Sequence, residues 1–180
     1  MAYEYEFLTV NLDDRLAEVI IDNPPINLMT PQLYQELRGL CAELEVDENL
    51  SVVLFKSANP DFFIAHFDVK AILDFPTDEE PKREEELNPF HQMCEQVRTM
   101  DKVTIAQIEG RVGGGGSEFV SSMDMRFGVI DRTIINQMEV PIGILPGGSG
   151  TQRLPRLIGL GRAMEVVLGG GDLDAKTAER

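Results

Sequence analysis

Residues 103–118 constrain the fold of this chain more than any other stretch. An apolar run at 103–108 has the composition of a buried strand, and four consecutive glycines follow at 113–116. A helix can open directly after them, at Ser117 and Glu118. Linkers seldom join a buried strand to a helix, so glycines at this place favour a functional loop over a linker. We therefore predict a strand, a tight glycine turn and a helix in succession.

This glycine turn has the properties of a site for developing negative charge. Glycine has no Cβ, so its backbone amide can approach a ligand closely, and a helix N-terminus adds unpaired N–H groups and a positive dipole end. Glu118 places a carboxylate beside the turn, and Glu139 precedes a second glycine-rich turn at 146–150. Backbone donors together with two carboxylates predict chemistry on a polarised carbonyl group.

Each of these features also has a simpler interpretation. The glycine run lacks the Gly-Lys-Ser/Thr of a phosphate loop, and a dinucleotide fingerprint would need glycine or alanine at Glu118. Glu118 alone could be a solvated acid of a first helical turn, and Glu139 alone a surface acid. His66 could be a base, but a half-buried histidine with a satisfied hydrogen bond is the commoner case. No serine lies in a Gly-x-Ser-x-Gly elbow, so a hydrolase triad lacks support.

Strands and helices alternate along the rest of the chain, which predicts an α/β fold without a domain linker. The expected strands are 5–10, 16–22, 51–56, 103–109 and 125–130, the first two forming a hairpin through 11–15. The expected helices begin at Thr30-Pro31, Asp68, Asn88-Pro89, about Gly116 and Ser149, and a last helix ends at 169–171. Ser149 and Gln152 have the spacing of a capping box. The charge run at 78–86 is expected to be a solvated loop or helix start.

Composition excludes several classes of function. The formal net charge of −15, from 31 acidic and 16 basic residues, argues against nucleic acid and against an anionic membrane as partners. No apolar run reaches membrane-spanning length, and the N-terminus lacks the features of a signal peptide, so a cytoplasmic protein is expected. Cys41 and Cys94 are expected to be buried free thiols, and no histidine has metal-ligand spacing to either.

Four segments resemble, in order, motifs of the crotonase (enoyl-CoA hydratase/isomerase) superfamily. They are residues 23–28, 63–70, 110–118 and 146–154, of which the last two are the most specific. The resemblance extends over nearly the whole chain and implies an α/β, crotonase-like superhelix of ββα units in one domain, residues 1–180. It also implies that the usual C-terminal helical region is absent, since typical members continue through several more helices.

The resemblance implies a role for individual residues. By motif position, the backbone N–H groups of Phe67 and Gly115 would form the oxyanion hole for a thioester carbonyl. In a hydratase, Glu118 would help to activate water for attack on Cβ, and Glu139 would deliver a proton to Cα. The further substrate-binding residues that it implies are Ala65, His66, Asp68, Gly114, Pro146 and Gly147.

The resemblance implies an acyl-CoA substrate, with coenzyme A as part of the substrate and neither a separate cofactor nor a metal. Lys56, Lys70 and Arg111 are candidate contacts for the CoA phosphates, although a solvated surface role is the commoner one for each. A homo-oligomer, a trimer or hexamer, is expected if the C-terminal helices are present in the native chain.

The chain departs from the family pattern at two places. His66 replaces a glycine of the first oxyanion turn; if that turn needs a positive φ, histidine tolerates it better than most residues. Phe67 is expected to narrow the acyl pocket. The segment 134–138 lacks the Phe-Gly and proline common in hydratases and is one residue longer, so Glu139 could be displaced or serve another chemistry.

The sequence thus predicts an acyl-CoA thioester enzyme of fatty acid metabolism. Two acids favour hydration of a 2-enoyl-CoA to a 3-hydroxyacyl-CoA. An isomerase, which can work with one glutamate, or a C–C bond hydrolase of the same superfamily is the near alternative. The alternative from another class is a non-catalytic oligomeric binding protein.

Overall fold

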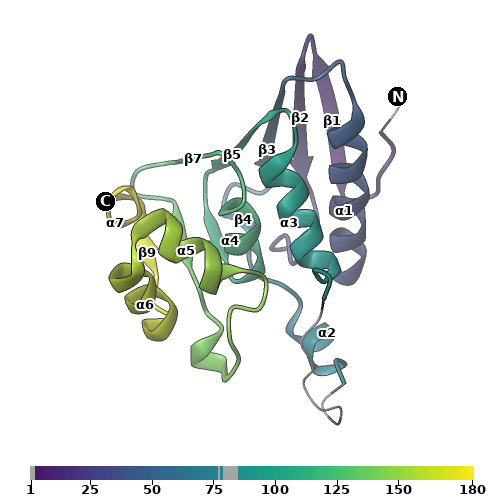
Figure 1. Cartoon of the computed structure of the whole chain (residues 1–180). Helices are drawn as coiled ribbons and strands as arrows, with labels where there is room; N and C mark the ends of the chain where they lie inside the picture. Colours follow the sequence, from purple (N-terminus) through teal and green to yellow (C-terminus); the bar gives the residue numbers. More distant parts are fainter. Residues whose placement is uncertain (1–2, 77, 79–84) are drawn as a thin grey trace.

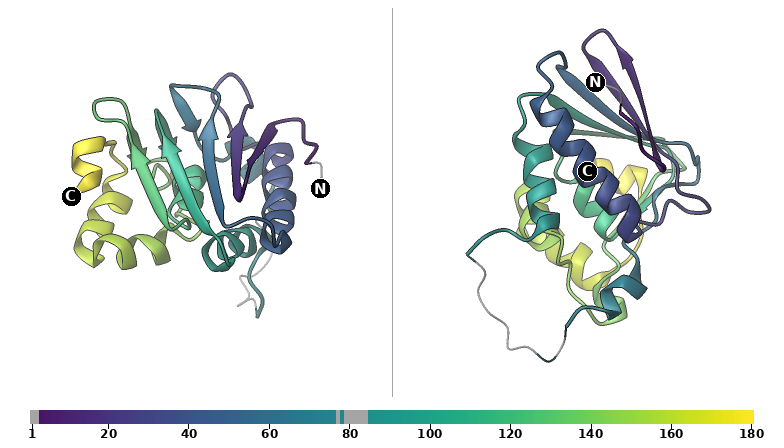
Figure 2. Two further views of the ribbon diagram at one scale, coloured as in Figure 1. Left: turned by 90° about the horizontal axis from the view of Figure 1, so that it is seen from above. Right: turned by 90° about the vertical axis from the view of Figure 1, so that its right-hand side faces the viewer.

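A computed structural model of the chain describes residues 3–76, 78 and 85–180. Strands and helices alternate along it, which confirms the predicted α/β fold (Figure 1). The N-terminus and the C-terminus lie at opposite ends of the molecule (Figures 1 and 2). Most of the charge run at 78–86 lies outside the described residues. Within them, no helix is both long and apolar enough to cross a membrane.

The larger of two sheets has five strands in the order β1-β2-β3-β5-β7. Their bounds are β1 Leu8–Asp13, β2 Leu16–Ile21, β3 Val52–Ser57, β5 Val103–Ile108 and β7 Met125–Gly128. β1 and β2 form the predicted antiparallel hairpin, and the other neighbours pair in parallel. β1 begins three residues later than predicted, because the N–H groups of Glu6 and Phe7 donate to the Glu36 carboxylate instead of a strand.

Two long helices, α1 (Pro31–Val46) and α3 (Pro89–Thr99), cover one face of this sheet (Figures 1 and 2). Both begin as predicted. The Thr30 hydroxyl accepts from the Leu33 N–H at 3.2 Å, and the Asn88 side chain accepts from the His91 N–H at 3.0 Å, each ahead of a proline in the first turn. Their buried faces join the core and include both cysteines, which are buried free thiols as predicted. Those on α1 are Leu33, Leu37, Leu40, Cys41 and Leu44; those on α3 are Met93, Cys94 and Val97.

The smaller sheet was not predicted as such. Its order is β4-β6-β8-β9, with bounds β4 Phe62–Ile64, β6 Arg111–Gly113, β8 Ile134–Asn136 and β9 Leu173–Asp174. Asn27 joins the two sheets, because its buried side-chain amide donates to the carbonyl of Ile21 in β2 and to those of Phe62 and Phe63 in β4. Asn27 thereby ties β4, which precedes the first predicted oxyanion turn, to the five-stranded sheet.

The remaining helices are shorter. They are α2 Val69–Leu73, α4 Gly115–Val120, the 3-10 helix η1 Val140–Ile142, α5 Gly150–Ile158, α6 Leu160–Gly169 and α7 Ala175–Glu179. Of these, α4 and α7 pack against strands of the smaller sheet. The helix after Ser149 is confirmed, but the predicted capping box is wrong. Ser149 has a φ of 96°, and its hydroxyl accepts from the Arg153 Nε at 2.7 Å instead of capping the first turn.

Candidate active site

The first predicted oxyanion turn connects β4 to α2. A parallel bridge to Met29 holds its backbone: the Met29 N–H donates to the His66 carbonyl at 2.9 Å, and the Asp68 N–H donates to the Met29 carbonyl at 3.0 Å. Asp68 caps α2 by accepting from the Lys70 N–H at 2.9 Å. Within the described part of the chain, the Phe67 N–H between these bonds donates to no acceptor. It is therefore available to a ligand.

The second predicted turn connects β6 to α4. Gly114 has a φ of +50°, which favours glycine, and an added Cβ would lie 3.0 Å from the Glu139 Oε1. At Gly115 an added Cβ would lie 3.1 Å from the Phe67 Cβ and 3.8 Å from the Phe67 nitrogen. The two turns therefore touch at these residues. Among the residues described, the Gly115 N–H also donates to no acceptor, as the geometry of a first helical position allows.

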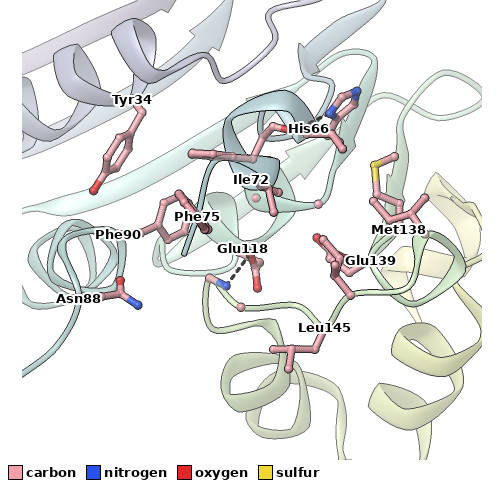
Figure 3. A pocket seen from close by; sticks show the side chains of 18 of the residues that line it. Tyr34, His66, Ile72, Phe75, Asn88, Phe90, Glu118, Met138, Glu139 and Leu145 are labelled. Atoms are coloured by element: carbon pink, nitrogen blue, oxygen red, sulfur yellow. Dashed lines mark hydrogen bonds between the residues drawn. The ribbon is translucent and has the colours of Figure 1, made fainter. Parts of the chain in front are cut away.

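Glu118 is buried, with 3% of its surface exposed, although α4 is only six residues long. Its carboxylate accepts from the Gly150 N–H at 2.7 Å and from the Gly148 N–H at 3.0 Å, so the second glycine-rich turn holds it in place (Figure 3). Burial raises the pKa of Glu118 to about 8, and the charge of Glu139 adds to this rise, while the two N–H donors oppose it. The interpretation of Glu118 as a solvated acid is thereby excluded.

Glu139 lies between β8 and η1 and is 7% exposed. Its Oε2 accepts no hydrogen bond from any described residue. Burial raises the pKa of Glu139, and the charge of His66 opposes that rise. Glu118 and Glu139 line the same cavity (Figure 3), so the longer segment before Glu139 has not removed it from the site. The charge of Glu139 acts on the Glu118 carboxyl group, so the protonation of Glu139 affects the pKa of Glu118.

The cavity has a volume of about 800 Å³ and a largely apolar wall. Its lining includes seven of the predicted site residues: His66, Phe67, Gly114, Gly115, Glu118, Glu139 and Gly147. Ala65, Asp68 and Pro146 are not part of the lining. Ala65 is buried behind the first turn, Asp68 caps α2, and Pro146 is buried near Gly150.

His66 is a half-buried histidine with a hydrogen-bond partner, the commoner case named for it from the sequence. His66 has no positive φ, so the first turn does not require one, and its Nδ1 lies 2.8 Å from the Phe67 carbonyl oxygen. Phe90 of α3 is only partly buried and also lines the cavity. Tyr34 of α1 also lines the cavity, which the sequence did not predict. The leucines beside it on α1 indicate only a helix that faces the core.

The basic residues considered for phosphate binding lie outside the cavity lining. Lys56 pairs with Glu18 at 3.3 Å, and the Arg111 guanidinium makes two hydrogen bonds of 2.6 Å to Asp172. Arg38 of α1 does line the cavity. Within the ranges that the structure describes, no three His, Cys, Asp or Glu side chains are grouped to hold a metal ion.

Comparisons with known proteins find relatives over nearly the whole chain. The family model described as enoyl-CoA hydratase/isomerase matches residues 12–180. A structure from Streptomyces avermitilis, provisionally described as an enoyl-CoA hydratase, is 36% identical with a TM-score of 0.85. Pseudomonas aeruginosa DspI is 28% identical with a TM-score of 0.85, and an enoyl-CoA hydratase from Geobacillus kaustophilus is 27% identical with a TM-score of 0.87. Each match covers 97% of this chain but only 65% of the other chain.

Proposed function

Because the chain belongs to the enoyl-CoA hydratase/isomerase family, we propose that it adds water to a 2-enoyl-CoA to form a 3-hydroxyacyl-CoA. One observation carries this proposal: two buried carboxyl groups and two adjacent N–H groups without protein acceptors, among the described residues, line one cavity. The reaction needs two hydrogen-bond donors for the carbonyl oxygen of the thioester. It also needs a base that takes a proton from water and an acid that gives one to Cα. Both requirements are met within this lining.

The Phe67 and Gly115 N–H groups bind the thioester carbonyl oxygen in this proposal. Attack of water on Cβ moves electron density to that oxygen and gives an enolate-like intermediate. Fixed donors stabilise the growing charge without reorganising, so they lower the barrier more than they stabilise the substrate. Ala65 and Asp68 act as positioning residues for the first turn, because they hold its backbone rather than touch the cavity. Pro146 lies against Gly150, whose N–H holds Glu118.

Glu118 and Glu139 divide the proton transfers between them. Burial raises the pKa of both groups, while the Gly148 and Gly150 N–H donors favour the ionised form of Glu118. The active form in this proposal is the one in which Glu118 is ionised and Glu139 carries a proton. Glu118 accepts a proton from water as the oxygen bonds to Cβ, and Glu139 gives a proton to Cα. The product contains all atoms of the enoyl thioester and the water. No group beyond the CoA part of the substrate is needed for these steps.

The test is the turnover of 2-enoyl-CoA thioesters by Glu118→Gln and Glu139→Gln variants. We follow the loss of the conjugated enoyl absorbance and identify the 3-hydroxyacyl product by mass. Each variant should lose about 100-fold or more in kcat, the usual size of an acid–base contribution. Glu48→Gln is the matched control, because Glu48 is exposed and outside the cavity lining. Undiminished turnover in both site variants would remove the hydratase assignment.

The same variants separate hydration from isomerisation. An isomerase needs one carboxylate to move a proton between Cα and the γ carbon, so one of the two variants should then convert 3-enoyl-CoA to 2-enoyl-CoA at the full rate. A binding protein without activity would bind the thioester and leave its absorbance unchanged. Assembly into a trimer or hexamer stays a prediction from the family resemblance.

A further inference from the structure

Three aromatic rings form a continuous surface on one side of the cavity, which we call the aromatic wall. It consists of Tyr34 from α1, Phe67 from the first turn and Phe90 from α3. Each ring contacts the other two. The Tyr34 and Phe90 rings stack at 5.8 Å and 26°, while Phe67 meets Tyr34 at 6.1 Å and Phe90 at 6.2 Å edge to face. These are the arrangements that aromatic pairs prefer.

The aromatic wall lies next to the atoms proposed to react. Phe67 carries one of the two N–H groups that would bind the carbonyl oxygen. At the other end, a Cβ added to Gly148 would lie 2.6 Å from the Phe90 ring and would overlap the Glu118 carboxylate. Phe90 therefore lies beside the acid that would act at the substrate Cβ (Figure 3). The wall extends from the carbonyl site to the position of Cβ.

This placement bears on which acyl groups the cavity accepts. A ring attached to Cβ is conjugated with the enoyl group and so lies in one plane with it. Such a ring would meet the exposed faces and edges of the wall in stacked or edge-to-face contact. An alkyl chain of equal carbon number would bury similar area but would lose rotational freedom and make no such contact. The lining also includes Met138, Ile142 and Leu145, which are not aromatic and would contact either substituent alike.

We propose that this cavity selects 2-enoyl thioesters that carry an aromatic ring on Cβ. The preference among substrates of the reaction rests on the proposed function. The preference in binding aryl thioesters does not depend on it. Tyr34 and Phe90 are then specificity-determining residues. Phe67 has a double role, since its N–H binds the carbonyl and its ring forms the end of the wall nearest to the carbonyl site.

Two substrates with nine acyl carbons test the selection: 3-phenylpropenoyl-CoA and 2-nonenoyl-CoA. The measured quantity is the ratio of their kcat/KM values, which a general loss of stability would not change. Phe90→Leu and Tyr34→Leu should each lower the aryl-to-alkyl ratio on the order of tenfold, as expected for losing one aromatic contact. Phe90→Tyr and Tyr34→Phe keep the ring and should retain the ratio. Phe127→Leu, at an exposed phenylalanine of β7 outside the lining, is the matched control.

A binding measurement separates this inference from the proposed reaction. The saturated analogues 3-phenylpropanoyl-CoA and nonanoyl-CoA cannot be hydrated, and calorimetry gives their Kd values. The wild type should bind the aryl analogue on the order of tenfold more tightly, and Phe90→Leu should abolish that difference. If the protein hydrates neither substrate but still binds the aryl analogue more tightly, only the proposed reaction is overturned. Equal Kd values in the wild type, or a ratio that Phe90→Leu leaves unchanged, would overturn the selection.

Discussion

The two sheets of this molecule share one apolar core but differ in how many polar side chains they bury. The five-stranded sheet with α1 and α3, which we call the framework, buries mostly aliphatic and aromatic residues. The site layer, as we call it, is the four-stranded sheet with α4 and the segment from Thr133 to the start of α5. Besides apolar residues such as Phe63 and Phe119, it buries most of the buried polar side chains among the described residues. They are Ser117, Glu118, Thr133, Asn136, Gln137, Glu139 and Ser149.

Several of the buried polar atoms in the site layer have no hydrogen-bond partner among the described residues. They are Ser117 Oγ, Asn136 Oδ1, Gln137 Oε1 and Glu139 Oε2. Each such atom destabilises a fold by about 1–3 kcal/mol. The framework must therefore supply the stability that the site layer lacks. The comparison indicates that changes in the framework should lower stability first, whereas changes in the site layer should lower activity first.

The largest effect on stability is expected in the framework. Leu37→Ala removes a fully buried side chain from the middle of α1 and leaves a cavity. The free energy of unfolding should fall by about 2–5 kcal/mol, measured by chemical denaturation. Below the unfolding transition, kcat per folded molecule should stay near the wild-type value, because Leu37 does not line the active cavity. A stability loss well under 1 kcal/mol would contradict the role given to the framework.

Gly115→Ala is the matching change in the site layer. Its added methyl group would lie 3.1 Å from the Phe67 Cβ, so the two turns must separate by a few tenths of an ångström. Because this alters the spacing of the two N–H donors, kcat for enoyl-CoA hydration should fall about 100-fold, comparable to losing one oxyanion donor. The unfolding free energy should change much less than in Leu37→Ala. If activity is retained while stability collapses, the division between the two layers is wrong.

The framework is also the part of the fold that the sequence predicts well. Threonine or asparagine followed by proline marks the starts of α1 and α3, and leucines at helical spacing mark the buried face of α1. The site layer escapes such prediction, because its strands have only two or three residues and show no periodicity. Its position depends on Asn27, whose bonds reach residues far away in the sequence. No local pattern contains that information.

The same contrast holds for the site. Glu118 and Glu139 could be singled out because each lies beside a glycine-rich turn in the sequence. Their burial and the cavity that they share are products of tertiary packing. Tyr34 and Phe90 could not be assigned to the cavity, since each sits on a helix whose neighbouring residues face the core. Residues that join a site from distant helices carry no local signal.

A pH series tests whether the site layer destabilises the fold through Glu118. Its pKa is raised from an ordinary 4.5 to about 8 in the folded state, so the folded protein retains a proton that the unfolded chain releases. The stabilising contribution of the protonated form is complete below pH 4.5 and is lost as the pH rises to about 8. The unfolding free energy of the wild type, minus that of Glu118→Gln, should therefore fall with pH by at most about 1.4 kcal/mol per unit.

Glu139→Gln is the second arm of this series, since it removes the neighbouring charge that adds to the rise. In that variant the pKa of Glu118 should be lower. The stabilising contribution of protonated Glu118 should therefore be lost at a lower pH than in the wild type. A difference between wild type and Glu118→Gln that stays constant from pH 5 to 9 would mean that Glu118 is solvated in solution.

The smallest effect is expected at the edge of the site layer, where Arg111 of β6 pairs with Asp172 ahead of β9. The pair has ideal geometry, with two hydrogen bonds of 2.6 Å, but its side chains are 31% and 48% exposed. Water screens such a pair, so Arg111→Gln should lower the unfolding free energy by only about 0.2–1 kcal/mol. The KM for an acyl-CoA should not change, because Arg111 is held by Asp172 and lies outside the cavity lining. A severalfold rise in KM with unchanged stability would instead assign Arg111 to a CoA phosphate, and Asp172→Asn would then lower KM by releasing the guanidinium.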